Sequence, residues 1–197
     1  MFYNLPNCLT LSRIIVIPIL AILVMIHRPL TDLAACILFI IAGVTDYLDG
    51  KIARAWSQLS EIGRMLDPIA DKLLIGILLI AMAAYHHLPY AGLIPAMIIL
   101  FREILVSGLR EFLASSHVGL PVTKLAKWKT MFQMIAIGFL LAGNSSAKLL
   151  AMPWIPVELI GAMLLWISAL LTLITGWSYF NIGMKFINNR KDSSFVK

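Results

Sequence analysis

The chain has 197 residues, of which 60% are hydrophobic and 13% are charged, and its sixteen Lys and Arg residues outnumber its ten Asp and Glu residues. This composition excludes an ordinary soluble domain, and we expect no nucleic-acid partner. Apolar stretches long enough to cross about 30 Å of hydrocarbon recur along nearly the whole length, so the sequence predicts an integral membrane protein.

Charged, proline-rich and glycine-rich breaks divide the chain into predicted helices. They cover residues 5–26, 31–54, 62–85, 90–116, 122–142 and 156–187. In the first, Arg13 and the apolar run after it resemble a signal peptide, but no small-residue cleavage site follows, so we expect a retained span. The short connectors favour antiparallel neighbours. We predict an all-α bundle of six transmembrane helices as one domain over residues 1–187, followed by a frayed polar cytoplasmic tail over 188–197.

The distribution of basic residues predicts the orientation of this bundle. With the N-terminus inside, only Arg28 and Lys148 of the sixteen Lys and Arg residues fall on the outer side. An excess of basic residues marks the cytoplasmic side of a membrane protein. We therefore expect a multi-pass protein of the inner (cytoplasmic) membrane with both termini in the cytoplasm.

The end of the second predicted helix and the start of the third carry four carboxylates at helical spacing. One face of the second helix presents two carboxylates and two small residues: Asp46, Asp49, Gly50 and Ala53. One face of the third helix repeats the pattern: Gly63, Asp67 and Asp71. A short turn joins the two helices, so the two faces can converge.

Four carboxylates at a membrane boundary need a cation among them, because each Asp costs about 2.5–3.5 kcal/mol at a bilayer centre. An all-oxygen set without Cys or His favours Mg²⁺ or Mn²⁺. The small residues let a flat ligand approach the helix backbone. An ordinary charge cluster with the neighbouring Lys and Arg residues is the alternative, but it explains neither the shared faces nor the small residues.

These residues spell D-x-x-D-G-x-x-A-R, eight further residues, and G-x-x-x-D-x-x-x-D, from Asp46 to Asp71 without a departure. The segment resembles the signature of the CDP-alcohol phosphatidyltransferases. The resemblance implies a six-helix membrane bundle with a polar cavity facing the cytoplasm. It also implies transfer of a phosphatidyl group from CDP-diacylglycerol to an acceptor alcohol, with release of CMP.

The resemblance implies a role for each matching residue. Divalent metal would be held by Asp46, Asp49, Asp67 and Asp71. Asp71 would also be the catalytic base on the acceptor hydroxyl. CDP-diacylglycerol would be held by Gly50, Ala53, Arg54, Ser60 and Gly63 and, from an N-terminal N-x-x-T-x-x-R segment, by Asn7 and Thr10. For that N-terminal segment the alternative is two polar residues at a helix start and an Arg13 that snorkels to the interface.

Basic residues crowd the inner ends of the fourth and fifth predicted helices. We expect an acceptor phosphate to be bound by Arg102, Arg110, Lys129 and Lys124, because guanidinium groups grip phosphate bidentately and lysine adds point charge. Arg102 lies deep enough that it should face a cavity rather than lipid. Attraction to anionic lipid headgroups is the competing interpretation, which we favour for Lys127.

This second segment, R-E-x-x-x-S-x-x-R followed by K-x-K-T, resembles bacterial members of the family that use sn-glycerol 3-phosphate and make phosphatidylglycerophosphate. Inositol phosphate, serine or phosphatidylglycerol as acceptor remains open, and the family also suggests a homodimer. A divalent-cation transporter is an alternative from another class, but such sites lie near the midplane and often accompany internal repeats. A membrane prenyltransferase is a third possibility, but it would distribute two aspartate-rich motifs over well-separated helices, whereas this chain keeps all four aspartates in one short helix-loop-helix.

Overall fold

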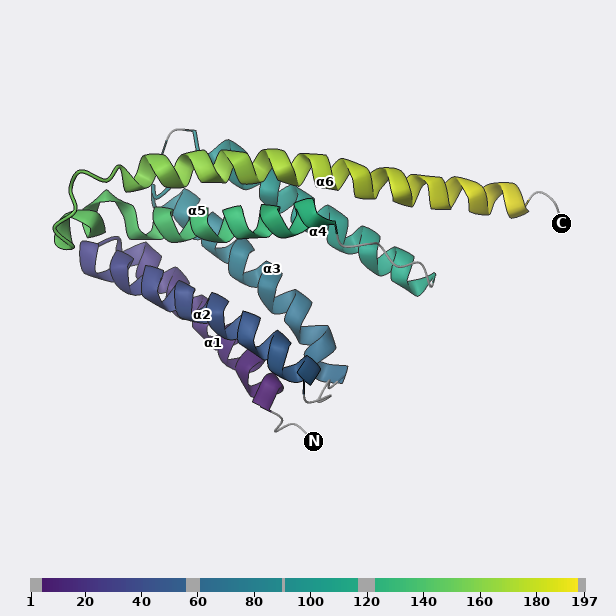
Figure 1. The fold of residues 1–197 in the computed structure, drawn as a ribbon, viewed down its shortest axis with the longest axis horizontal. Coiled ribbons are helices and arrows are strands. Elements are labelled where there is room, and N and C mark those ends of the chain that lie inside the picture. Colours follow the sequence, from purple (N-terminus) through teal and green to yellow (C-terminus); the bar gives the residue numbers. More distant parts are fainter. Residues whose placement is uncertain (1–4, 56–60, 90, 117–122, 195–197) are drawn as a thin grey trace.

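The computed structural model describes residues 5–55, 61–89, 91–116 and 123–194, and this part of the chain is all-helical, without a strand. Its helices are α1 (Leu5–Ile26), α2 (Pro29–Ala55), α3 (Glu61–Ala84), α4 (Leu93–Ser115), α5 (Lys124–Leu149) and α6 (Val157–Ser194). Figure 1 shows them as one elongated bundle. The six helices expected from the sequence are therefore confirmed, most of them to within three residues at either end.

Two helix ends differ from the prediction. Helix α5 continues past residue 142 to Leu149, with a break at Gly143, where φ is 61° and ψ is 170°. Glycine adopts this backbone conformation without steric cost. Helix α6 continues to Ser194, so the frayed tail expected over 188–197 is wrong for residues 188–194. Extending an existing helix adds one hydrogen bond per residue, which explains how a polar segment can stay helical.

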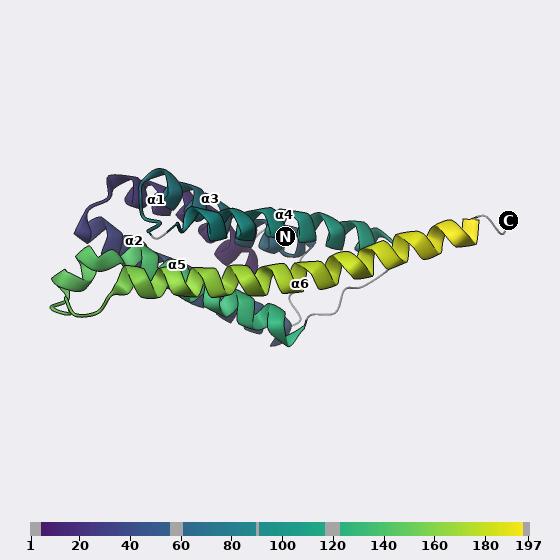
Figure 2. The same cartoon turned by 90° about the horizontal axis from the view of Figure 1, so that it is seen from above.

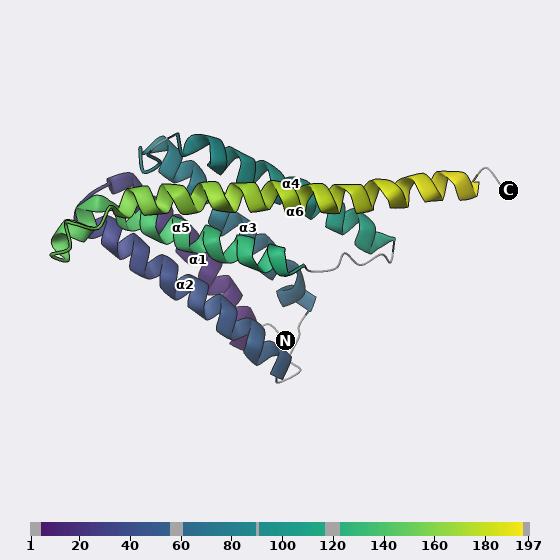
Figure 3. The same ribbon diagram turned by 45° about the horizontal axis from the view of Figure 1, so that its top comes forward.

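The helices pack as two groups that share one core. Helix α1 packs against α2 and α3, α5 packs against α2 and α6, and α4 packs against α6 (Figures 2 and 3). Each helix contributes buried apolar side chains, among them Leu20, Phe39, Leu78, Ile99, Leu140 and Leu165. The α1–α2, α3–α4 and α5–α6 connections lie toward the same end of the bundle in all three views.

The outer surface of the bundle is apolar. Large hydrophobic side chains stand exposed on every helix, and Phe101, Ile104 and Trp177 are each at least 65% exposed. A water-soluble monomer rarely tolerates so continuous an apolar surface. In the described residues, three helical segments are long and apolar enough to cross a membrane, beginning at Pro29, Lys124 and Val157. The fold is thus that of a membrane protein, with exposed apolar side chains suited to contact with lipid.

Candidate active site

Three helices bring the predicted carboxylates together at one place. Thr10 and Arg13 come from α1, Asp46 from α2, and Asp67 and Asp71 from α3. The Thr10 hydroxyl donates a hydrogen bond to Asp67 Oδ1 at 2.5 Å. Arg13 Nη1 lies 2.5 Å from Asp46 Oδ1 and donates to Asp71 Oδ1 at 2.9 Å. The two aspartate faces therefore converge on one side of α1.

Arg13 supplies one positive charge to these carboxylates. Its side chain is 2% exposed, whereas those of Asp46 and Asp71 are 43% and 56% exposed. The guanidinium group thus lies beneath the carboxylates and balances their charge from inside the bundle. The alternative in which Arg13 snorkels to the interface is wrong, because its charged end is directed inward. A buried arginine requires such partners, since an unpaired buried charge costs several kcal/mol.

The open side of this arrangement is where the predicted divalent cation would be bound. Arg13 contacts one oxygen of Asp46 and one of Asp71, and both carboxylates remain about half exposed. Asp67 is also exposed. Carboxylate oxygens with room for water and phosphate oxygens are the ligand set that Mg²⁺ prefers. The metal-binding role of the three aspartates stays a prediction.

The structure describes the other residues predicted to bind metal or CDP-diacylglycerol less completely. Asp49, Gly50, Ala53 and Arg54 lie on the last turns of α2 and Asn7 lies on α1, but their side chains are outside the described part of the structure. Ser60 lies outside the described residues altogether. Gly63 is buried near the start of α3, on the turn before Asp67. The metal-binding role of Asp49 and the donor-binding roles of the other residues stay predictions.

A cavity of about 1240 Å³ opens beside the aspartates. Asp71 lines its α3 wall, Arg102 and Arg110 line it from α4, and Lys129 lines it from α5. Three of the four cations assigned to an acceptor phosphate therefore face the same space as the assigned base. The fourth, Lys124, is exposed at the first turn of α5 and is not among the lining residues.

Arg102 is held in this cavity by contacts from α6. Its side chain is 9% exposed, and its Nη2 donates to Thr175 Oγ1 at 3.1 Å. A Cβ on Gly176 would come within 3.0 Å of Arg102 Cγ, so the absence of a side chain there makes room for the arginine. Arg102 Nε is buried without a hydrogen-bond partner in the described residues. An unsatisfied donor of this kind is available to a ligand that brings oxygen atoms.

Lys129 is the second deep cation of the cavity. It is 5% exposed and its ammonium group forms a short ion pair with the Glu103 carboxylate, which also lies 3.6 Å from Arg102 Nη1. Glu103 therefore compensates the charge of two buried cations. Gln133, one turn further along α5, is 3% exposed and its Oε1 has no described hydrogen-bond partner.

Several residues at this cavity have no role predicted from the sequence. Glu103 lies two turns before Arg110 and Gln133 one turn after Lys129, so helical spacing could have indicated both. Lys127, assigned above to lipid headgroups, lines the cavity as well. No sequence pattern links Tyr179 to these cations, because it lies far along the chain on α6. The centre of its ring lies 5.6 Å from the guanidinium carbon of Arg102 and 5.3 Å from that of Arg110.

Similarity to known proteins shows the family of this chain. A sequence profile of the CDP-alcohol phosphatidyltransferases matches residues 3–174, which include both the aspartate cluster and the cationic cavity. The chain belongs to the CDP-alcohol phosphatidyltransferase family. The resemblance inferred from the aspartate motif is thereby confirmed.

Curated relatives within the family are similar over nearly their whole length. A CDP-diacylglycerol–glycerol-3-phosphate 3-phosphatidyltransferase of Rickettsia bellii is 44% identical, and the match covers 93% of this chain and 97% of the relative. Proteins with the same description from Cereibacter sphaeroides and Bacillus subtilis are 39% and 36% identical, over 97% and 91% of this chain and 100% and 94% of theirs. The second sequence segment had indicated the same branch of the family.

Proposed function

We propose that this chain transfers the phosphatidyl group of CDP-diacylglycerol to sn-glycerol 3-phosphate, giving phosphatidylglycerophosphate and CMP for phospholipid biosynthesis. The observation that carries the proposal is the cavity that joins Asp71 to Arg102, Arg110 and Lys129. A base at one end and phosphate-binding cations at the other suit an acceptor that carries both a hydroxyl and a phosphate. The curated relatives named above carry the same activity in their descriptions.

The aspartate cluster is the proposed site for the diphosphate of the donor. Asp46, Asp49, Asp67 and Asp71 are the residues that would hold Mg²⁺ or Mn²⁺. When bound, such a metal neutralises the diphosphate and the charge that develops on the leaving CMP. Arg13 fixes the directions of Asp46 and Asp71 from below, and Thr10 fixes that of Asp67. Positioned carboxylates avoid reorganisation at the moment of reaction.

The acceptor is proposed to lie between Asp71 and the cations of α4 and α5. Its phosphate would contact Arg102, Arg110 and Lys129, which directs its free hydroxyl toward Asp71. Asp71 would take the hydroxyl proton as the acceptor oxygen forms a bond to the β-phosphorus. The bond from that phosphorus to the bridging oxygen then breaks, and CMP leaves. Holding the two reactants in this geometry supplies much of the rate enhancement.

The membrane arrangement follows from the position of this site. We propose six spans, since even α1, the shortest helix at 22 residues, is about 33 Å long at 1.5 Å per residue. The aspartate cluster and the cavity would face the cytoplasm, with both termini on that side of the inner membrane, because most basic residues fall on that side. A homodimer in the bilayer is part of the same proposal, by analogy with the family.

A panel of acceptors tests the proposed function directly. Purified protein in detergent with CDP-diacylglycerol and Mg²⁺ should release CMP when glycerol 3-phosphate is added. Glycerol, serine and inositol phosphate should each give far less, because the first two lack the phosphate and the last has a different shape. CMP release with inositol phosphate alone would reject the assigned acceptor, and divalent-cation transport into vesicles without CMP release would reject the enzyme.

Arg110→Ala is expected to raise the KM for glycerol 3-phosphate about 10-fold or more, with a much smaller effect on the KM for CDP-diacylglycerol. The reason is that Arg110 lines the acceptor part of the cavity, and a charge-assisted hydrogen bond contributes about 1.5–3 kcal/mol. Steady-state kinetics with each substrate varied in turn measures both constants. Arg28→Ala, which makes the same change at an exposed arginine outside the cavity, is the matched control. Equal changes in both KM values would count against the assigned role.

A further inference from the structure

A second cluster of ligating side chains lies at the other end of the helices that form the aspartate site. His27 follows the last residue of α1, Asp32 lies in the first turn of α2, and His87 follows α3. One suitable atom from each of the three residues lies within 4.8 Å of those of the other two. His27 comes 14 residues after Arg13, so about 21 Å of helix separates this cluster from the aspartate contacts of Arg13.

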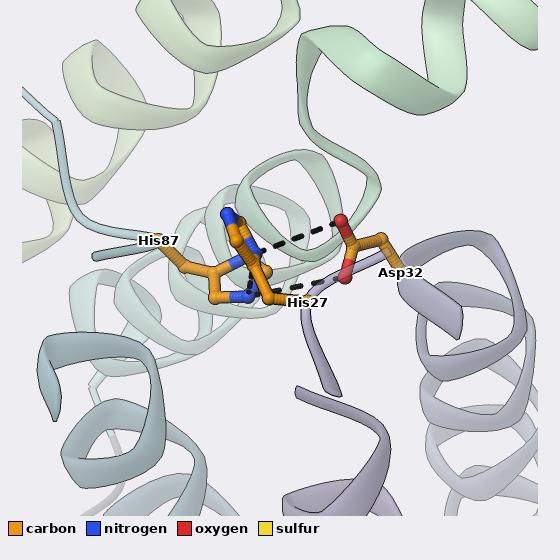
Figure 4. Close-up of side chains that lie close together, drawn as sticks. All are labelled: His27, Asp32 and His87. Atoms are coloured by element: carbon orange, nitrogen blue, oxygen red, sulfur yellow. Dashed lines mark hydrogen bonds and ion pairs between the residues drawn. The ribbon is translucent and has the colours of Figure 1, made fainter. Parts of the chain in front are cut away.

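Figure 4 shows the Asp32 carboxylate facing both imidazole rings. His27 Nδ1 lies 2.6 Å from His87 Nε2. The carboxylate is further away: Asp32 Oδ2 lies 3.8 Å from His27 Nδ1, and Asp32 Oδ1 lies 3.9 Å from His87 Nε2. The two rings meet edge to face at 80°. The three donor atoms therefore surround a common point, with ligands contributed by three different helix ends.

This cluster is buried where charge is costly. Asp32 is 4% exposed and His87 is 6% exposed. Asp32 Oδ1 is buried and accepts no hydrogen bond from any residue that the structure describes. An ionised carboxylate without such a partner loses solvation that nothing in the cluster replaces, since both of its distances to the histidines exceed hydrogen-bonding range. The orphaned oxygen points to a cation.

The contact between the two histidines also indicates a site for a cation. A nitrogen pair at 2.6 Å holds at most one proton, so one of the two rings must present a lone pair. His87 Nε2 also lies 3.2 Å from the Val24 carbonyl oxygen, which competes for that proton. A ring nitrogen with a lone pair beside a carboxylate is the arrangement that transition metals select.

We propose that His27, Asp32 and His87 form a binding site for Zn²⁺ that joins the outer ends of α1, α2 and α3. Two imidazoles and one carboxylate, with a water in the fourth position, are a known zinc ligand set. With ligand bonds of about 2.0–2.1 Å, the donor atoms of a tetrahedral zinc site lie about 3.4 Å apart. This value falls between the 2.6 Å that separates the two histidine nitrogens and the 3.8 and 3.9 Å that separate them from the carboxylate oxygens. The exposed His27 ring can move by the sub-ångström distance that this requires.

The sequence alone predicts that the histidines at 27, 86, 87 and 117 are surface residues, because they lie in predicted loops or at helix ends. The structure contradicts this prediction for one of them. His87 is buried, although His27 and His86 are exposed. His117 lies outside the described residues. The proposed zinc site does not depend on the proposed phosphatidyl transfer, because it shares no residue with the aspartates or the cavity.

Two exposed histidines offer a matched pair of substitutions. His27 and His86 both have left-handed backbone conformations, with φ of 47° and 60°, and Asn tolerates this region better than most residues. His27→Asn removes one ligand from the cluster, whereas His86→Asn makes the same chemical change beside it. Neither substitution removes a buried side chain, so both variants should fold.

Co²⁺ titration of the metal-free protein tests the proposal. The full chain, purified without a histidine tag and kept in excess Mg²⁺ to occupy the aspartates, should bind one Co²⁺ with the visible absorption of a tetrahedral site. Zn²⁺ should displace it and raise the unfolding temperature. His27→Asn should weaken Co²⁺ binding by at least about 100-fold, and His86→Asn should leave it unchanged. Absence of Zn²⁺-displaceable Co²⁺ in the native chain, or equal binding by His27→Asn, would overturn the proposal.

Discussion

Asp71→Asn should lower the rate of CMP release by about 1000-fold and leave the fold intact. General-base catalysis contributes typically 10²–10⁴-fold, and the amide cannot accept the hydroxyl proton. The substitution also removes one carboxylate from the proposed metal site, which adds to the loss. The side chain is 56% exposed, so Asn fits without steric change. A single-turnover assay with saturating CDP-diacylglycerol and glycerol 3-phosphate measures the rate of the chemical step.

Glu111→Gln is the control for this experiment. Glu111 lines the same cavity, and its substitution makes the same change from carboxylate to amide. It has no assigned part in the reaction, so its turnover should stay close to that of the native chain. A similar loss in both variants would mean that the cavity responds to net charge, and Asp71 would then have no special role as base.

Arg13→Met should destabilise the protein in metal-free buffer by about 2 kcal/mol, because Asp46 and Asp71 lose the buried cation between them. We place the effect below that of fully buried pairs because both carboxylates are about half exposed. For a chain of this size the unfolding temperature should fall by about 4–8 °C. Thermal unfolding in detergent, followed by circular dichroism, measures the shift.

Divalent metal should partly reverse this loss. In the absence of Arg13 the carboxylates repel one another, so Mg²⁺ should raise the unfolding temperature of Arg13→Met more than that of the native chain. Arg28→Met, which removes an exposed arginine at the opposite end of α1, is the matched control and should change little. An equal response to Mg²⁺ in all three proteins would contradict the position of Arg13 beneath the metal site.

The sequence predicted the helices and the aspartate faces well because both depend on local periodicity. Asp46 on α2, and Asp67 and Asp71 on α3, keep their helical spacing whatever the helices pack against. Pro68 does not end α3, which runs from Glu61 to Ala84, so Asp67 and Asp71 stay on one helix. Convergence was predictable because the connection between the two helices is short.

Features that depend on packing between distant helices could not be read from the sequence. The burial of Arg13 beneath the carboxylates requires α1 to lie against α2 and α3, and snorkelling to the interface was equally consistent with its position. The Tyr179 ring lies near Arg102 and Arg110 only because α6 packs along α4. The burial of His87 likewise follows from the meeting of three helix ends, which no local pattern records.

In the proposed reaction, the clustered carboxylates hold a divalent cation against the diphosphate of the lipid donor. A structure of the protein with Mn²⁺ and CDP-diacylglycerol, with anomalous scattering recorded at the manganese edge, measures this most directly. We predict a manganese peak coordinated by Asp46, Asp67 and Asp71 and by oxygens of the diphosphate. A diphosphate bound elsewhere, with no manganese at these three residues, would contradict the claim.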